Sequence, residues 1–168
     1  TLSPSSAASD VYKRQGYARA MLKAGFLYST SEEHEAFIAF KSSKESLGFG
    51  AVSELIKAVI RTMRFRDMIK LVKLAKKGGE SYEDSLKKAK KPYVFVGMLV
   101  VRRKYQGQGY MRKVLDIAYE EGKKLGCPVL LDTDAALKRD KYVHLGMKNV
   151  RTRKFDEGIV LYDLAKED

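Results

Sequence analysis

The sequence is poor in the side chains that build metal sites and disulfide frameworks. Its 168 residues include one cysteine, Cys127, and two histidines, His34 and His144. A lone cysteine forms no intrachain disulfide, and a structural zinc site needs about four soft ligands. We therefore expect a structural Cys127, no bound metal and a reducing, cytoplasmic location.

Long apolar segments are missing as well. No stretch reaches the roughly 18 consecutive apolar residues that a membrane-spanning helix requires. The chain does not open on a charged segment followed by an apolar one, as a secretory signal would. We expect no membrane partner. With 45% hydrophobic and 32% charged residues, the composition predicts a globular domain with a sizeable core.

Acidic side chains are outnumbered. The chain has 33 Lys and Arg against 21 Asp and Glu, which gives a formal charge of +12. Such a surface attracts polyanions, whether nucleic acid, membrane headgroups or a phosphorylated cofactor. The sign of the charge alone does not choose among them.

Residues 1–15, TLSPSSAASDVYKRQ, differ from the rest of the chain. They are rich in Ser and Ala and have no helical or strand period. The string SAASDVYKRQ also resembles translated sequencing-adapter sequence. We therefore expect a foreign or disordered leader over 1–15, and a single domain over 16–168 whose natural start is missing.

The first half of the domain shows mainly helical patterns. They predict a short helix over 17–26 ended by Gly25, a strand over 36–40, and a long helical region over 51–91 with breaks at 65–67 and 78–79. Pro92 then stops the helical region and precedes a strand.

The second half alternates between strand and helix patterns. The nearly continuous apolar run YVFVGMLVV, residues 93–101, predicts a central strand buried on both faces. The following patterns predict a glycine-rich turn, a helix to 125, a strand over 129–132, a helix over 135–145 closed by Gly146, and a hairpin of 148–155 and 159–164. This order predicts an α/β fold with a mixed central sheet flanked by helices.

The glycine-rich turn after the central strand is the clearest candidate site. A turn that leads into a helix N-terminus exposes unpaired backbone N–H groups where the helix dipole is positive, which suits a phosphate. An ordinary turn without a ligand is the alternative. The loop of nucleotide hydrolases is excluded because Tyr110 follows Gly109 where Lys is needed, and the dinucleotide fingerprint is excluded because Arg112 replaces its third glycine.

Two segments carry a resemblance to a known family. The stretch Gln106-Gly107-Gln108-Gly109-Tyr110-Met111 resembles the acetyl-CoA motif of the GNAT superfamily, with Met111 in place of Gly or Ala. The stretch Tyr142-Val143-His144-Leu145-Gly146-Met147 resembles the family's second signature, with Met147 in place of Phe. Ala135 and Lys138 depart from the family, which often has Asn and a small residue there. The resemblance is strongest over 93–147.

The resemblance implies a GNAT fold whose N-terminal strand is missing, and an N-acetyltransferase that moves the acetyl group of acetyl-CoA to an amine by direct attack. It assigns Tyr142 as the acid for the leaving thiolate, or alternatively as a residue that packs under the cofactor and hydrogen-bonds its sulfur without proton transfer. The implied contacts to the pantetheine arm are the backbones of Leu99, Val100 and Val101. The implied pyrophosphate site comprises Gln106, Gly107, Gln108, Gly109, Tyr110, Met111 and Arg112.

The resemblance leaves the general base open. The central strand contains no acid, and the nearest carboxylates, Asp132 and Asp134, have a capping or loop role as an equal alternative. It also leaves the acceptor open between a small amine and a peptide, and the oligomeric state open between a monomer and a homodimer.

Two rival functions remain. One is a basic binding module that keeps the fold without the activity, and the other is a truncated, inactive fragment. A row of basic residues in the long helical region suits either a polyanion site or a solvated helix face: Lys57, Arg61, Arg64, Lys70 and Lys73. We favour the solvated face and expect no nucleic-acid partner, because no nucleic-acid motif accompanies these residues.

Overall fold

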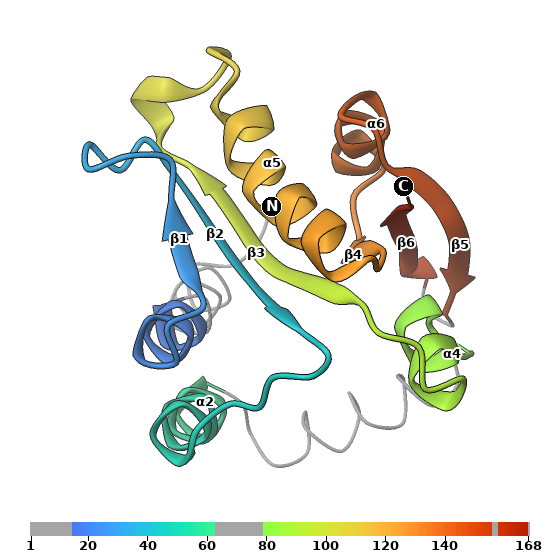
Figure 1. Ribbon diagram of the computed structural model, residues 1–168, viewed down its shortest axis with the longest axis horizontal. Coiled ribbons are helices and arrows are strands. Elements are labelled where there is room, and N and C mark those ends of the chain that lie inside the picture. Colours follow the sequence, from blue (N-terminus) through green and yellow to red (C-terminus); the bar gives the residue numbers. More distant parts are fainter. Residues whose placement is uncertain (1–14, 63–78, 156–157, 168) are drawn as a thin grey trace. The chain divides into compact units, whose positions relative to one another are not determined.

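The chain is divided into two units in a computed structural model that describes residues 15–62, 79–155 and 158–167 (Figure 1). The first unit combines residues 1–27 and 46–73, and the second combines 28–45 and 74–168. The proposed leader and the predicted helix break at 65–67 lie outside the described residues, apart from Gln15 at the leader's end.

The described part of the first unit is helical. One helix covers residues 15–23, and α2 covers Phe49–Thr62. Gly25 ends the first helix in the left-handed region with φ of 76°, and the N–H of Phe26 returns to the carbonyl of Met21 at 2.8 Å. This pattern is a Schellman motif, which needs a residue that tolerates positive φ. The predicted short helix and its glycine stop are thus confirmed.

The second unit is built on a six-stranded sheet in the order β1-β2-β3-β4-β6-β5. The strands are β1 (Leu27–Ser29), β2 (Ala36–Ser42), β3 (Val94–Val101), β4 (Val129–Thr133), β5 (Lys148–Lys154) and β6 (Val160–Lys166). The pairs β2–β3, β4–β6 and β5–β6 are antiparallel, while β3 and β4 are parallel. The predicted α/β fold with a mixed sheet is confirmed.

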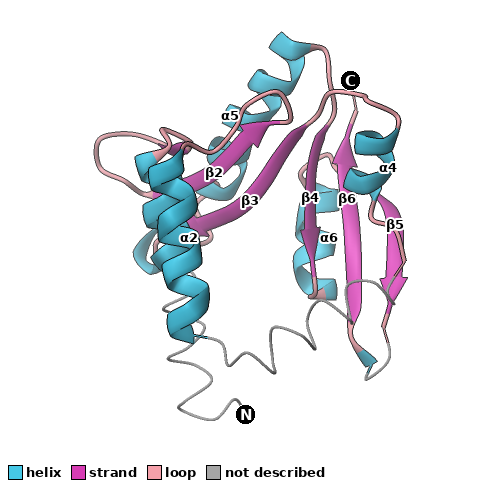
Figure 2. Cartoon of the chain, turned by 90° about the horizontal axis from the view of Figure 1, so that it is seen from below, coloured by secondary structure: helices cyan, strands magenta, loops and turns pink. Residues whose placement is uncertain are grey.

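Three α-helices cover this sheet: α4 (Tyr82–Lys88), α5 (Tyr110–Leu125) and α6 (Ala136–His144). A short 3-10 turn, η1 (Arg103–Tyr105), precedes α5. Helix α4 begins with a capping box, in which the Ser81 hydroxyl accepts from the Asp84 N–H and the Asp84 carboxylate accepts from the Ser81 N–H. Helices α5 and α4 lie on opposite faces of the sheet (Figure 2). The apolar side chains of α5 pack on one face, and those of α4 pack on the other.

The two faces of the sheet have separate cores. The larger core gathers Val114, Leu115 and Ala118 of α5 with inward residues of β2, β3 and β4. The smaller core joins Leu86 of α4 to Leu130 of β4. Because side chains alternate along a strand, β4 is buried from both sides, and its run of apolar residues is explained.

Strand β3 changes its pairing halfway along. Ala39 pairs with Met98 and Phe40 pairs with Val96, so Gly97 between them is an extra residue that makes a β-bulge. On its other edge β3 pairs with β4 only at Val94 and Phe95. Beyond these residues the two strands diverge, as Figure 2 shows. None of the helices in the described part of the chain is long and apolar enough to span a membrane.

Candidate functional site

The divergence of β3 from β4 leaves backbone groups of β3 without a strand partner on that side. The Arg102 N–H donates to the Glu35 carbonyl at 2.9 Å, so the backbone N–H and C=O groups of Arg102 point toward the β2 side of the strand. The N–H and C=O groups of successive residues point to opposite edges of a strand. Those of Val100 therefore also point toward β2, while those of Leu99 and Val101 point toward the opening. The structure thus offers the Leu99 backbone and the Val101 N–H to an added strand, while the Val101 carbonyl accepts from the Gln106 side chain.

The predicted contact at Val100 differs from its two neighbours. Its backbone is directed toward Phe37, its partner in β2. Its side chain is 44% exposed and lies on the sheet face opposite the large core, to which Leu99 and Val101 contribute. Any contact of Val100 with a ligand in the opening is therefore through the side chain. A sequence motif does not reveal this alternation, because it depends on the bulge at Gly97.

The glycine-rich turn follows directly after the open edge of β3. Gly107 and Gly109 have φ of 77° and 80°, a conformation that side chains other than glycine rarely adopt. Gly109 is also the N-cap of α5, and it makes no side-chain capping bond. Within the described part of the chain, five consecutive backbone N–H groups, those of residues 107–111, have no hydrogen-bond acceptor. Together with the α5 dipole they form a concave anion site.

The side chains of the two glutamines in the turn donate hydrogen bonds to nearby backbone carbonyls. The Gln106 amide donates to the Val101 carbonyl at 3.2 Å, and the Gln108 amide donates to the Lys104 carbonyl at 2.8 Å. The rings of Tyr105 and Tyr110 lie 5.3 Å apart. Of the predicted pyrophosphate contacts, Gln106 and Gln108 therefore serve the shape of the turn through their side chains, and they leave the main-chain amides for a ligand.

Positive side chains surround the turn. The Lys104 ammonium lies 4.6 Å from the centre of the Tyr105 ring, and the Lys113 ammonium lies 4.6 Å from that of Tyr110. Arg112 is exposed and follows Met111 in the first turn of α5. These charges reinforce the attraction of the turn for an anion.

A groove of about 570 Å³ adjoins the turn between the start of α5 and helix α6. It is lined by Gly109, Met111, Arg112, Leu137, Asp140, Lys141, His144 and Leu145. Met111 and Leu137 give it apolar surface, and Leu137 is 79% exposed. A groove of this size and lining suits an organic ligand that has an apolar part next to its anionic groups.

Tyr142 of α6 lies on the same sheet face as α5. Its side chain is partly buried against the larger core, and burial raises the pKa of its hydroxyl above the usual value. The phenol therefore stays protonated over the physiological range and is able to donate a proton. Tyr119 of α5 supports this helix, because its hydroxyl donates to the Leu145 carbonyl at 3.1 Å.

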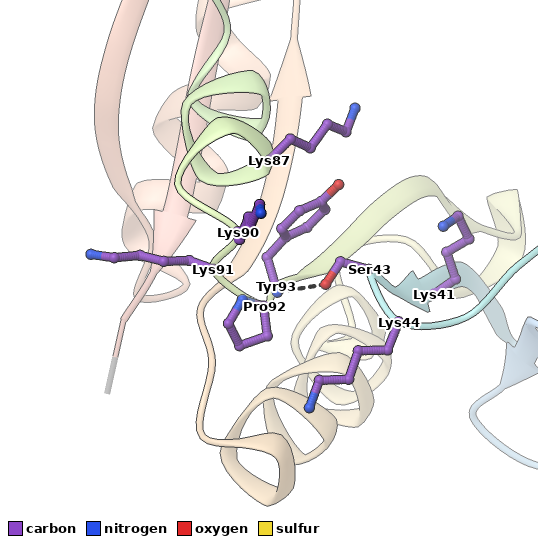
Figure 3. Close-up of a pocket in the computed structure, with 8 residues that line it drawn as sticks. All are labelled: Lys41, Ser43, Lys44, Lys87, Lys90, Lys91, Pro92 and Tyr93. Carbon is purple, nitrogen blue, oxygen red and sulfur yellow. Dashed lines mark hydrogen bonds between the residues drawn. The ribbon is translucent and has the colours of Figure 1, made fainter.

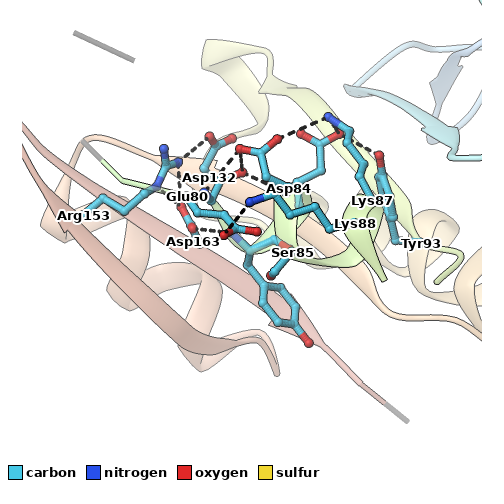
Figure 4. Close-up of polar contacts among 12 residues, drawn as sticks. Glu80, Asp84, Ser85, Lys87, Lys88, Tyr93, Asp132, Arg153 and Asp163 are labelled. Atoms are coloured by element: carbon cyan, nitrogen blue, oxygen red, sulfur yellow. Dashed lines mark hydrogen bonds and ion pairs between the residues drawn. The ribbon is translucent and has the colours of Figure 1, made fainter. Parts of the chain in front are cut away.

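Asp132 of β4 lies on the other face of the sheet. Neighbouring Leu131 points into the larger core, so alternation directs Asp132 toward the α4 side. Burial raises the pKa of the Asp132 carboxyl, against an opposing effect of Arg153, whose guanidinium lies 3.4 Å away. Arg153 is held by Asp163 at 2.7 Å (Figure 4). The sequence placed Asp132 at the strand end, but it gave no sign of this pairing.

The structure therefore brings the predicted residues together in three groups. The open edge of β3 and the turn at 106–112 are continuous, and the groove joins this turn to the helix that carries Tyr142. Ala135 is the N-cap of α6 and makes no side-chain capping bond. Among the described residues, no group of three or more His, Cys, Asp or Glu side chains is placed to hold a metal ion.

Comparisons with known proteins agree with the fold. Residues 77–145 match the Acetyltransferase (GNAT) family. Among solved structures, arylalkylamine N-acetyltransferase 2 of Aedes aegypti is 14% identical, with a TM-score of 0.59 over 90% of this chain and 77% of that one. The polyamine N-acetyltransferase of Drosophila melanogaster is 10% identical, with a TM-score of 0.54 over 90% of this chain and 79% of that one.

Other matches are shorter. A protein of Agrobacterium tumefaciens assigned to the acetyltransferases is 27% identical, with a TM-score of 0.41 over 45% of this chain and 57% of that one. No curated protein sequence matches the chain. The chain thus has the fold of the GNAT acetyltransferases, and the match of residues 77–145 to the Acetyltransferase (GNAT) family supports acyl transfer as its class of activity.

Proposed function

We propose that this protein is an N-acetyltransferase that uses acetyl-CoA and acetylates an amine by direct attack. One observation carries the proposal: an open β3 edge leads straight into a turn whose five consecutive amides, residues 107–111, have no acceptor among the described residues. A ligand with an extended arm and a pyrophosphate matches both features at once. Few other ligands combine a strand-like amide arm with two adjacent phosphates.

The residues present fit this cosubstrate. The Leu99 backbone and the Val101 N–H would pair with the pantetheine arm, and the amides from Gly107 to Met111 would hold the pyrophosphate. Arg112 and the groove beside α6 would receive the remaining part of the molecule. When bound, acetyl-CoA supplies the acetyl group as an activated thioester.

Tyr142 is proposed as the acid on the α5 side of the sheet. Its hydroxyl holds a proton because burial raises its pKa, and a leaving thiolate needs a proton donor nearby. Packing against the larger core fixes the ring, so the hydroxyl is oriented without a hydrogen-bond partner among the described side chains. A residue that only packed beside the sulfur would give no change in rate when its hydroxyl is removed.

Asp132 is proposed as the proton acceptor on the α4 side of the sheet. A free alkylamine has a pKa of about 10, so it must lose a proton before it attacks. The raised pKa of Asp132 makes its carboxylate a stronger base than an ordinary aspartate, and its side chain, 41% exposed, remains accessible to an amine. Acid and base then lie on opposite faces of the opening, so the acceptor amine approaches from the face opposite Tyr142. Two insect structures with this fold act on arylalkylamines and polyamines, and we propose a small amine or peptide acceptor here.

Dye-monitored thermal unfolding with and without acetyl-CoA tests the proposal, since the chain has no tryptophan. Ligand at one hundred times its Kd should stabilise the fold by roughly 2.7 kcal/mol. The variant Gly109→Pro should show no shift, because proline does not adopt the φ of 80° found there. If a folded protein shows no shift with acetyl-CoA, the basic binding module without activity replaces this proposal.

A further inference from the structure

A second basic hollow lies at the opposite end of β3 from the glycine-rich turn. It has a volume of about 480 Å³ and is formed by the end of β2, the residues after α4 and the residues just before β3. Its lining consists of Lys41, Ser43, Lys44, Lys87, Lys90, Lys91, Pro92 and Tyr93 (Figure 3). We call this site the lysine hollow.

Most of the charge in the lysine hollow is uncompensated. Lys87 is paired with Glu83 at 3.0 Å and lies 3.7 Å from Asp84. For the other four lysines no ion pair is found among the described residues, and the Lys41 ammonium donates to the Glu45 backbone carbonyl at 3.3 Å. In Figure 3, Lys87 and Lys90 lie beside the Tyr93 ring, while Lys44 and Lys91 extend away from it. Lysine stems are long and rotatable, so all of these ammonium groups are able to turn toward a bound anion.

The backbone of the hollow keeps a lysine where glycine is the usual residue. Lys90 has φ of 53° and follows the C-cap of α4, Ala89. The Lys91 N–H returns to the Leu86 carbonyl at 3.0 Å, which completes a Schellman motif with Lys90 in the left-handed position. Glycine adopts this conformation without the steric cost that a side chain incurs. A lysine held there against its backbone preference points to a function for the side chain.

Two hydrogen bonds join Ser43 and Tyr93 at the floor of the hollow. The Ser43 N–H donates to the Tyr93 carbonyl at 2.8 Å, and the Tyr93 N–H donates to the Ser43 hydroxyl oxygen at 3.1 Å. The Ser43 hydroxyl thereby keeps its proton for another acceptor. The Tyr93 hydroxyl donates to Glu83 at 2.9 Å, which fixes the ring between the lysines.

Helix electrostatics do not account for the whole cluster. Lysines favour the last turn of a helix because the carbonyl end of the dipole is negative, and this explains Lys87. Lys41 and Lys44 come from β2 and the loop after it, where no helix ends. At position 90, glycine would adopt the left-handed conformation at a lower steric cost than lysine does, so the backbone does not explain Lys90. The same hollow thus receives charge from two separate segments of the chain.

We propose that the lysine hollow binds a small molecule that carries two or more phosphate groups, independently of the acetyl-CoA site. The eight residues of β3 separate it from the glycine-rich turn by roughly 26 Å at 3.3 Å per residue, so one ligand does not reach both sites. Its volume is that of a small-molecule pocket. A nucleic-acid backbone would need a continuous basic track, whereas these lysines surround one hollow.

Titration calorimetry of the whole chain with inorganic triphosphate tests the proposal. The affinity should fall with salt, and Lys91→Gln should weaken it about fivefold, while the matched Lys123→Gln on the exposed end of α5 should not. Lys90→Gly should weaken binding to a similar degree and leave the melting temperature unchanged or higher, because glycine removes the backbone strain. Loss of binding without loss of stability distinguishes a ligand site from a structural lysine.

Four outcomes would overturn the proposal. Absence of triphosphate binding, or an equal loss in Lys123→Gln, would show that the hollow is only part of a diffuse basic surface. Displacement of triphosphate by acetyl-CoA would place the anion at the glycine-rich turn instead. A short oligothymidylate that bound more tightly than triphosphate and lost affinity in Lys91→Gln would identify a nucleic acid as the ligand.

Discussion

Phe95 of β3 and Leu130 of β4 form the last register pair between these two parallel strands. Both side chains pack in the smaller core beneath α4, which closes the strands at this end. Beyond this pair, β4 remains bonded to β6 as far as Thr133, while β3 carries the bulge at Gly97 and remains bonded to β2. Each strand thus keeps its hydrogen bonds to one neighbour. Only the backbone groups that β3 and β4 would direct toward each other lose a partner within the sheet.

The conformation of Gly109 gives the first prediction. Gly109→Ala should raise the Kd for acetyl-CoA about tenfold, because alanine at φ of 80° is strained by roughly 1–2 kcal/mol and shifts the turn that presents the amides. Gly126→Ala is the matched control, since Gly126 is also left-handed, at φ of 60°, and ends α5 instead of starting it. Both variants should lose similar stability in thermal unfolding, and only the first should lose affinity in calorimetry. Equal affinities would contradict the role of the turn.

The second prediction concerns the hydroxyl of Tyr142. Tyr142→Phe should lower kcat by about 100-fold or more, with the KM for acetyl-CoA unchanged, because the acid acts only on the leaving group. Tyr119→Phe is the control: it removes the bond to the Leu145 carbonyl and should cost about 1 kcal/mol of stability with little change in kcat. Steady-state rates with a screened amine acceptor measure both. A Tyr142→Phe enzyme of normal kcat would leave Tyr142 as a packing residue.

The third prediction follows from the raised pKa of Asp132. If its carboxylate is the proton acceptor, kcat/KM should fall tenfold per pH unit once the pH drops below this pKa, which lies above the usual 3.9. Asp132→Asn should abolish this fall of kcat/KM at low pH, the acid limb of the pH profile, and lower the rate about 100-fold or more. The control Asp134→Asn, two residues further on, should keep the limb. A limb that survives in Asp132→Asn belongs to another group.

The same shift has a consequence for stability. Because the folded pKa of Asp132 is raised, the native state binds a proton more readily than the unfolded chain does. This group therefore lowers the free energy of unfolding as the pH rises from the ordinary carboxylate pKa through the raised one. In Asp132→Asn, this pH-dependent fall in the free energy of unfolding should be absent when urea unfolding is measured across the same pH range.

Much of the architecture was predictable because it depends on local chemistry. Gly25, Pro92 and Gly146 mark ends that the structure confirms. The apolar run of β3 correctly indicated a strand, but burial on both faces is wrong for its second half, where β4 diverges and Val100 is 44% exposed. Strand β1 was missed because Leu27–Ser29 is only three residues long, too short to show an alternating period. The predicted helix ends differ by up to three residues from the observed ones, since capping groups decide them.

The site was predictable only where a motif covers it. The turn at 106–111 carries its signal in adjacent residues, so its position at the start of α5 was found from the sequence. The opening of β3 was not, because it depends on which strand each edge pairs with. The pairing of Arg153 with Asp132 and the basic lining contributed by Lys41 and Lys90 join residues far apart in the chain, and periodicity does not show such contacts.

The fourth prediction concerns the ion pair beneath α4. Arg153→Met should destabilise the protein by about 3–5 kcal/mol, because it leaves the carboxylate of Asp163, whose side chain is 5% exposed, without its cation. Arg139→Met is the comparison, since Arg139 pairs with the more exposed Asp140 and should contribute no more than about 1 kcal/mol. Denaturant unfolding of the two variants gives the difference. The Tyr82 N–H also donates to the Asp163 carboxylate, at 2.8 Å, and similar values for the two variants would mean that this bond alone satisfies Asp163.

The last prediction concerns the contact of α5 with β4. A methyl group at Gly122 would lie 2.5 Å from Val129 Cγ2 and 2.9 Å from the Cys127 carbonyl oxygen, closer than packed atoms approach. Gly122→Ala should therefore destabilise the protein by about 1–3 kcal/mol, although alanine is favoured over glycine in a helix by up to about 1 kcal/mol. Gly50→Ala in α2 is the control, because nothing lies within 4 Å of that position and only the helix preference remains. Thermal unfolding should show opposite signs for the two variants; a stabilised Gly122→Ala would mean that α5 is free to move away from β4, and the geometry of the turn would then not be fixed by this contact.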